Sequence, residues 1–507
     1  MQRSGTYGRP APLVPVLLFL GITALLLAVL LVPLAQSALD GDLRILDLLF
    51  AASVLPFLAV IILFPRWRAA AAIALIFILP GPIDSLLPRV SIGYTPDASL
   101  RIVSLLDLVF LLVVVLRWPV IRRQKLLSPT LLVLLAAMTI LSVLSSLSSL
   151  DRLLGYREGA LLTGILPLRL FLVYLFVSSS IHTARQVSDL LLGVVVGALG
   201  LLANGAYFSL VNASPRFTAG VFGNNTFGNV LAIIGLIAVG MFLLPAPRHW
   251  RYLGLVTGGL CAVGIVLTGT RMSVVAFGLG AIALITAMPI ALPRRLTLIG
   301  LIVGASSAVL LVGGRLFSTS ISRLLDLPRL ILSGELLGVS EMQTRLTNWA
   351  VSFQMLEEHP WLGIGPGQWN FERIEHGLWL WIDVFDPHNG YILLATEYGL
   401  PFLLLFALLV GYCFWQGLAA LRAAYARRDR VVAATLLPVL IAAAAIALTE
   451  LTNAGLLKLH LQLFYGVVFF TLVASRRFAQ SSEQPQQRAA GVSPSAQALP
   501  QSISASS

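Results

Sequence analysis

A histidine and several arginines beside long apolar segments are the residues best suited to chemistry. His388 stands in Asp386-Pro-His-Asn-Gly390, directly before an apolar segment. A histidine at the edge of such a segment can take up a proton near neutral pH, as a general base must. The alternative is that His388 only caps the following helix or hydrogen-bonds its own loop. The residue type alone leaves both readings open.

Three arginines in the connections between apolar segments are further candidates. Arg271 lies in the short connection Leu267-Thr-Gly-Thr-Arg-Met-Ser273, which holds no other charge, and Arg345 opens a helical pattern in a long connection. Arg216 precedes Gly220–Asn229, a stretch rich in glycine and asparagine. A guanidinium binds phosphate through two parallel hydrogen bonds, so these positions predict a site for an anionic substrate. The alternatives are that Arg271 only snorkels to the membrane surface and that Gly220–Asn229 only starts a helix.

Other charged residues lie within or beside the apolar segments. Arg169 follows Pro167 in the middle of one segment, and an ionisable residue there is a functional candidate unless it balances a carboxylate such as Asp107. Glu450 and Lys458 flank the last two segments, where we expect them to form an outer ion pair.

The elements that must position these residues are membrane-spanning helices. Hydrophobic residues make up 58% of the chain and charged residues 11%, whereas a soluble domain has about 25% charged residues. The apolar runs are long enough to cross a hydrocarbon core about 30 Å thick. We predict an all-α polytopic membrane protein with about 14 (12–14) transmembrane helices. The candidate spans lie near 12–35, 43–64, 69–87, 101–116, 127–147, 160–181, 187–209, 225–244, 252–268, 272–292, 296–312, 390–418, 431–449 and 457–474.

Basic residues fall in alternate connections between these spans, which explains the net charge of +12 without nucleic acid. This positive-inside pattern predicts that both termini are cytoplasmic. The first run, Leu13 to Leu34, is too long for the apolar region of a signal peptide and lacks a convincing cleavage site, so we expect it to be a span and not a cleaved leader. Cys261 and Cys413 lie inside spans and predict no disulfide, and no motif has the spacing of a zinc site or of a phosphate-binding loop.

One connection, Gly313 to Asn389, is much longer than the others and is predicted to be external. It is acidic, with five Arg against nine Asp and Glu, and Glu341–Glu358 has helical spacing. Its tryptophans Trp361, Trp369, Trp379 and Trp381 fit either a loop half-submerged at the interface or stacking on sugars. We divide the chain into an N-terminal bundle (1–209), helices with outer arginine motifs (210–312), this structured loop with short helices (313–389), C-terminal helices (390–479) and a disordered cytoplasmic tail (480–507).

The order of motifs around the loop resembles the O-antigen ligase and polymerase family. The resemblance rests on Arg345-Leu-Thr-Asn-Trp349, Glu358-His-Pro-Trp-Leu-Gly-Ile-Gly-Pro-Gly367, Pro387-His-Asn-Gly-Tyr391 and Glu397-Tyr-Gly-Leu400, together with the upstream stretches Gly220–Asn229 and Thr268–Ser273. It covers roughly Arg216 to Leu409, whereas the first 200 residues are similar only as generic spans.

The resemblance implies a metal-independent, inverting glycosyltransferase of GT-C-like fold in the bacterial inner (cytoplasmic) membrane, without a cofactor. Such enzymes move a glycan from undecaprenyl diphosphate to a saccharide acceptor on the periplasmic or external face. Ligases use a lipid A–core sugar as acceptor, and polymerases use another lipid-linked repeat. The acidic loop favours a ligase over an O-antigen or exopolysaccharide polymerase. A transporter of lipid-linked sugars is less favoured, because the charges gather at the outer rim and not at the midplane.

The resemblance also implies residue roles. His388 would be the general base, and Arg271 and Arg345 would stabilise the departing diphosphate. Arg216 is a third candidate for binding the substrate, and Asn389 and Glu397 would orient His388 or its loop. Arg169 is the remaining substrate-binding candidate. Family ligases have about 12 spans, so the count of about 14 is a departure.

Overall fold

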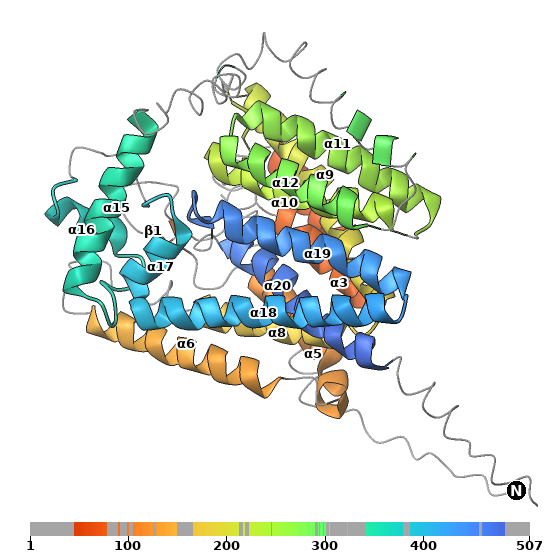
Figure 1. The fold of residues 1–507 in the computed structure, drawn as a ribbon, viewed down its shortest axis with the longest axis horizontal. Coiled ribbons are helices and arrows are strands. Elements are labelled where there is room, and N and C mark those ends of the chain that lie inside the picture. The colour runs from red at the N-terminus through yellow and green to blue at the C-terminus, as the bar shows by residue number, and fades with distance from the viewer. Residues whose placement is uncertain are drawn as a thin grey trace, which may run out of the picture.

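The computed structural model describes residues 45–78, 90–91, 99–100, 105–124, 128–149, 166–211, 216–218, 223–244, 246–288, 340–378, 386–455 and 459–481, with a few positions between 293 and 322. These residues form a helical bundle with a group of shorter helices at one end (Figure 1). A two-residue antiparallel pair, β1 (Val90–Ser91) with β2 (Ser99–Leu100), is the described sheet.

Six of the described helices are long and apolar enough to cross a membrane. They are α6 (Pro129–Ser148), α9 (Ala184–Val211), α10 (Gly223–Leu243), α11 (Arg248–Thr268), α18 (Leu400–Ala426) and α19 (Arg430–Thr449). Shorter apolar helices lie among them: α2 (Ile45–Leu63), α3 (Arg68–Ile78), α8 (Leu166–Ser180) and α12 (Arg271–Ala287). Helices α5 (Leu105–Gln124) and α20 (Leu459–Ser481) complete the bundle.

Helix α10 lies at the centre of the bundle, packed against α9, α11, α12 and α19. Small residues let the helices approach closely, as is usual where lipid supplies no hydrophobic drive for packing. A side chain at Gly240 would overlap the Pro438 ring of α19, and one at Gly193 would overlap the Ala70 backbone of α3. These close approaches hold the C-terminal end of α10 against α19 and hold α9 against α3.

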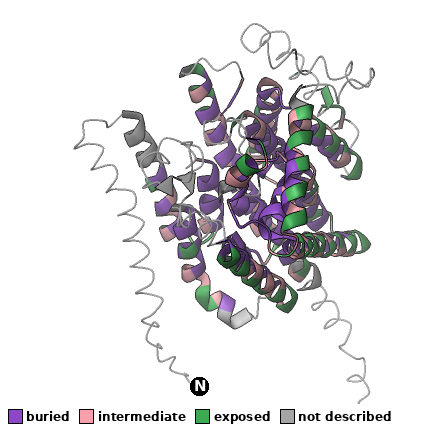
Figure 2. Ribbon diagram, turned by 90° about the vertical axis from the view of Figure 1, so that its left-hand side faces the viewer, coloured by how far each residue is buried: buried purple, intermediate pink, exposed green. Residues whose placement is uncertain are grey.

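The outward surfaces of the outer helices are apolar. Val133 on α6, Ile282 on α12 and Leu404 on α18 are each at least 60% exposed. Figure 2 shows buried residues gathered inside the bundle and exposed ones on its outer helices. An apolar periphery around a packed interior is stable only in hydrocarbon, so this is a multi-pass membrane protein.

The helices follow the predicted spans closely where both can be compared, with one correction. The predicted span 390–418 is two helices, α17 (Gly390–Tyr398) and α18, separated at Gly399, which has φ 87°. The spans near 12–35 and most of 296–312 lie outside the described residues, so the count of about 14 stays a prediction.

Candidate functional site

The described part of the long connection, residues 340–378, forms a small unit at one end of the bundle. It contributes α15 (Ser340–Glu358) and α16 (Trp369–Glu375), which lie beside α17 (Figure 1). A separate hydrophobic core joins them, made of Val351, Met355, Ile364, Trp369, Leu378, Leu393 and Ala454. Predicted helix Glu341–Glu358 is thereby confirmed as α15. The loop is a packed structure that can hold side chains in fixed places.

The tryptophans of this unit do not share one role. Trp369 is buried, and its ring N–H donates to Ser352 Oγ at 2.8 Å, so it belongs to the core and neither stacks on sugar nor lies in the interface. Trp361 is 74% exposed, which leaves it accessible. Trp379 and Trp381 lie outside the described residues.

Glu397 holds the glycine-rich turn of the loop against α17. It is 2% exposed, and its Oε1 accepts from the Trp369 backbone N–H at 3.4 Å. The backbone N–H of Gly365 donates to the Glu397 carbonyl oxygen at 3.1 Å. Burial raises the pKa of the Glu397 carboxyl to about 8, so it is mostly protonated at neutral pH. This geometry fits a residue that positions the loop.

His388 is held in an unusual backbone conformation. Its φ is 54°, in the left-handed region that a residue other than glycine seldom adopts. The Asp386 carboxylate oxygen Oδ1 accepts the His388 backbone N–H at 2.6 Å and lies 3.0 Å from His388 Nδ1. An Nδ1–H donated to this carboxylate leaves Nε2 as the basic ring nitrogen, and the side chain is 33% exposed. The residue thus has the orientation and access that a general base needs.

The helix that follows His388 is capped by Asn389 instead. The Asn389 side-chain oxygen accepts the backbone N–H groups of Tyr391 at 3.0 Å and Ile392 at 3.1 Å. This is the usual N-cap arrangement, and Asn389 is its residue. The alternative that His388 caps the helix is therefore wrong, whereas its hydrogen bond within the loop is present.

The segment 450–455 is hydrogen-bonded to the end of the His388 loop. The Gly390 backbone N–H is shared between the carbonyl oxygens of Glu450, at 2.8 Å, and Asn453, at 3.0 Å. Glu450 is 1% exposed, and a side chain on either Gly390 or Gly455 would overlap its carboxyl oxygens. It is a buried carboxyl within the site, whereas its expected partner Lys458 lies outside the described residues.

Arg345 approaches the same segment from α15. Its Nη1 donates to the Thr452 carbonyl oxygen at 3.2 Å. On the other side of the His388 loop, the Trp349 ring N–H donates to the Pro387 carbonyl oxygen at 2.8 Å. Arg345 and the His388 loop are therefore fixed to one another through α15 and segment 450–455.

Arg216 and Arg271 form a second group around the start of α12. Arg216 Nε donates to the Thr268 carbonyl oxygen at 2.7 Å, and its Nη2 donates to Asn225 Oδ1 at 3.3 Å. Arg271 is the first residue of α12 and follows Thr270, whose hydroxyl donates to the Asn224 carbonyl oxygen at 3.3 Å. A cation at a helix N-terminus opposes the helix dipole, so helix stability does not explain Arg271.

A contact between Thr226 and Asn453 connects the two groups. The Thr226 hydroxyl, in the first turn of α10, donates to Asn453 Oδ1 at 3.3 Å, and Asn453 also accepts from Gly390. The N-termini of α10, α12 and α17 therefore meet at one end of the bundle. Each helix N-terminus carries about half a positive charge, and Arg271, Arg216 and Arg345 add full charges beside them. Such an arrangement is chemically suited to an anion, and the His388 loop belongs to the same end of the bundle.

Arg169 lies apart from these residues. It is in α8, where its Nε is 3.3 Å from Asp107 Oδ2 of α5, and both residues are buried. This is the ion pair that the sequence left as the alternative. Among the described residues, no three His, Cys, Asp or Glu side chains gather as ligands of a metal would.

Sequence reasoning missed Asp386, Glu450 and Asn453 as parts of the site. Asp386 had a usable signal, because an acidic residue two positions before a histidine in a turn can reach its backbone N–H and ring. The contacts of Glu450 and Asn453 join residues about 60 positions apart and have no local signal.

Comparison with known protein families gives a match over part of the chain. Residues 253–407 match the family model described as O-antigen ligase. That range contains Arg271, Arg345, His388, Asn389 and Glu397. Among curated proteins, nothing matches the chain.

Proposed function

We propose that this protein transfers a glycan from undecaprenyl diphosphate to a sugar hydroxyl outside the membrane. The match of residues 253–407 to the O-antigen ligase family supports this proposal. The observation that carries the proposal is the convergence of an Asp386–His388 pair with three arginines and three helix N-termini. A polyprenyl diphosphate is an anion anchored in the membrane, so a cationic site at the rim of the bundle suits it.

In the proposed reaction, His388 Nε2 accepts the proton of the acceptor hydroxyl while that oxygen attacks the anomeric carbon. The bond from this carbon to the diphosphate breaks on the opposite face, so the configuration is inverted. Asp386 stabilises the imidazolium that forms, and the proton later passes to water. The diphosphate is already a competent leaving group, so the enzyme has to position the reactants and stabilise departing charge.

Arg271 and Arg345 are the residues proposed to stabilise that charge. A guanidinium has five N–H donors, so the bond from Arg345 to the Thr452 carbonyl positions the group and leaves donors for phosphate oxygens. Arg216, bound to α10 and α11, is proposed to support Arg271 across the turn. Arg169 is proposed to have a structural role through Asp107.

We propose a lipid A–core sugar as the acceptor, which makes the protein a ligase. A polymerase would run the same reaction with a second lipid-linked repeat as acceptor. Supplying purified protein with labelled donor and each acceptor in turn separates the two, because the ligase reading predicts product with the core sugar alone.

The test of the mechanism compares two histidines of the same loop. His388→Gln is expected to lower transfer about a hundred- to ten-thousand-fold, as loss of a general base does, with donor binding retained. His376→Gln is the matched control, because among the described residues the His376 ring contacts the Glu372 carbonyl and the Glu358 carboxylate, away from Asp386 and His388. Transfer by His388→Gln near the wild-type rate would refute the proposal. Because family chemistry needs no metal, a chelator should leave the wild-type rate unchanged.

Orientation in the membrane is proposed from the charge pattern. A cysteine at Gln343 on α15 should react with an impermeant thiol reagent on intact cells, whereas one at Arg427 after α18 should not. The reverse labelling pattern would overturn the orientation and with it the external site.

A further inference from the structure

Basic residues gather at the end of the bundle opposite to α15, α16 and α17, where α2, α5, α8 and α20 end (Figure 1). They come from the connection after α2, the start of α3, the second half of α5 and the last turns of α20. The residues are Arg66, Arg68, Arg117 and Arg477, with His182 beside them. The charge pattern predicts that this end is cytoplasmic.

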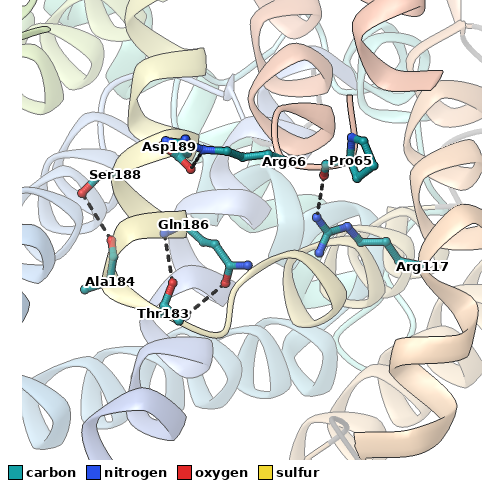
Figure 3. Close-up of polar contacts among 8 residues, drawn as sticks. All are labelled: Pro65, Arg66, Arg117, Thr183, Ala184, Gln186, Ser188 and Asp189. Carbon is teal, nitrogen blue, oxygen red and sulfur yellow. Dashed lines mark hydrogen bonds and ion pairs between the residues drawn. The ribbon is translucent and has the colours of Figure 1, made fainter. Parts of the chain in front are cut away.

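Arg66 has an acidic partner of its own. Its Nε and Nη2 lie 3.3 Å from the two carboxylate oxygens of Asp189 on α9, as Figure 3 shows. Its guanidinium also lies 4.5 Å from the centre of the Trp67 ring. This charge is therefore largely balanced within the protein.

Arg68 and Arg117 contact backbone carbonyls instead. Arg68 donates to the carbonyl oxygens of Ile61 at 2.7 Å and Ile62 at 3.2 Å, in the last turn of α2. Arg117 donates to the carbonyl oxygens of Ser179 at 2.9 Å, in the last turn of α8, and Pro65 at 3.0 Å (Figure 3). Within the described part of the chain, no carboxylate lies within salt-bridge distance of either arginine.

The helix ends do not balance these charges. A helix C-terminus carries about half a negative charge, so the ends of α2 and α8 supply about one negative charge against two guanidinium groups. Arg68 and Arg117 are close enough to repel one another. Arg477, whose Nη1 lies 3.5 Å from the Ser178 carbonyl oxygen, adds a third positive charge.

The pKa of the neighbouring His182 reflects the same excess of positive charge. Burial lowers the pKa of His182, and the charges of Arg117 and Arg477 lower it further. His182 therefore stays neutral near pH 7 and adds no charge of its own. The guanidinium groups of Arg68 and Arg117 alone leave an excess of about one positive charge at this end of the bundle.

Exposed apolar side chains lie near Arg68 and Arg117 along the chain. Leu63, the last residue of α2, is 67% exposed, and Phe64 after it is 53% exposed. Trp118, next to Arg117, is 46% exposed. Tryptophan is typical of the membrane–water interface, where one part of a side chain meets acyl chains and another meets headgroups. A lipid bound here could therefore place its phosphate against the arginines and its acyl chains against the exposed apolar side chains.

We propose that Arg68, Arg117 and Arg477 form a basic cluster that binds the phosphate headgroup of an anionic phospholipid. Guanidinium groups bind phosphate through charge-assisted hydrogen bonds, and basic pockets between helix ends are a known way to hold such headgroups. The acyl chains of the lipid pack against Leu63, Phe64 and Trp118. The bound lipid supplies the negative charge that α2, α5 and α8 lack where they meet. This inference does not depend on the proposed transferase activity.

The experiment measures which lipids the purified full-length protein retains. Wild-type protein is incubated in detergent with equal amounts of phosphatidylglycerol and phosphatidylethanolamine, and bound lipid is counted by native mass spectrometry. We expect at least a tenfold preference for phosphatidylglycerol and a higher thermal-unfolding midpoint with it. Equal retention of the two lipids by the wild-type protein would overturn the proposal, whatever the variants do.

Two variant pairs then separate the basic cluster from general surface charge. Arg68→Gln with Arg117→Gln should reduce the preference to within threefold. Arg422→Gln with Arg428→Gln removes two exposed arginines at the end of α18 and should keep the preference. An equal loss in both pairs would mean that surface charge alone attracts the lipid. Stabilisation of the wild-type protein by inorganic phosphate to the same extent as by phosphatidylglycerol would refute a lipid site, because the acyl chains would then contribute nothing.

Discussion

Replacing Asp386 tests the Asp386–His388 pair more sharply than replacing the histidine. In Asp386→Asn, the side-chain oxygen can still accept both N–H groups of His388, from the backbone at 2.6 Å and from Nδ1 at 3.0 Å. The loop should therefore keep its shape, and only the negative charge is lost. A hydrogen bond to a charged group contributes about 1.5–3 kcal/mol and a neutral one about 0.5–1.5 kcal/mol. The difference of about 1–1.5 kcal/mol predicts a loss of roughly five- to tenfold in transfer rate.

Asp386→Ala removes both hydrogen bonds, so His388 loses its orientation as well as its charged partner. We expect a loss approaching that of His388→Ala, about a hundred- to ten-thousand-fold. The assay is transfer of a labelled lipid-linked glycan at saturating donor, with donor affinity measured separately and expected to be unchanged. Asp429→Asn is the matched control, because Asp429 caps α19 at the other end of the bundle and asparagine caps equally well. Wild-type rates in both Asp386 variants, or equally large losses in both, would refute this division between charge and shape.

Three further predictions concern the residues around the pair. Arg271→Lys and Arg345→Lys should each lose at least about tenfold in transfer with normal expression, because lysine lacks the planar fork; full activity of both would make these arginines structural. Gly390→Ala should lower transfer and lower the free energy of unfolding by about 1–3 kcal/mol, because the new methyl group would overlap the buried Glu450 carboxyl. Gly411→Ala in α18, where open space surrounds the glycine, should do neither, and equal effects would contradict the overlap. The thermal-unfolding midpoint of the wild-type protein should fall from about pH 4.5 to about pH 8, because the buried Glu397 carboxyl, with a pKa raised to about 8, keeps its proton where the unfolded chain releases it. Glu397→Gln should flatten this decline. Parallel pH profiles of wild type and variant would count against this cause.

Helices were predictable from the sequence because apolar length is a strong signal in membrane proteins. The division of the predicted span 390–418 into α17 and α18 was missed, since hydrophobicity continues across it. The signal for it was present: Gly399 takes φ 87°, and Pro401 lies in the first turn of α18, the position where proline starts helices. The Leu400 N–H donates to the Pro360 carbonyl oxygen at 2.9 Å, so the break also depends on the distant loop.

Within the site, residue types indicated the chemistry but not the connections. Arg345 and His388 could be placed near one another because both belong to one long connection. Glu450 was expected at the surface, because a glutamate after an apolar helix usually meets water or a lysine there. It is buried because Gly390 and Gly455 leave room for its carboxyl, and that fit depends on how α17 and α19 pack together.

The backbone of His388 shows how the fold prepares the site. A non-glycine residue in a sparsely populated region costs about 1–3 kcal/mol. Hydrogen bonds hold the loop on both sides of this residue: Asp386 accepts the His388 N–H, the Pro387 carbonyl oxygen accepts from Trp349, and the Gly390 N–H donates to segment 450–455. Each contributes about 0.5–1.5 kcal/mol, or more where a carboxylate is the acceptor. Together these bonds offset the strain, so His388 is held in place before substrate arrives. In the proposed reaction, a base that needs no reorientation can act as soon as the acceptor hydroxyl reaches Nε2, so losing the bonds at Asp386 should harm transfer more than it harms folding.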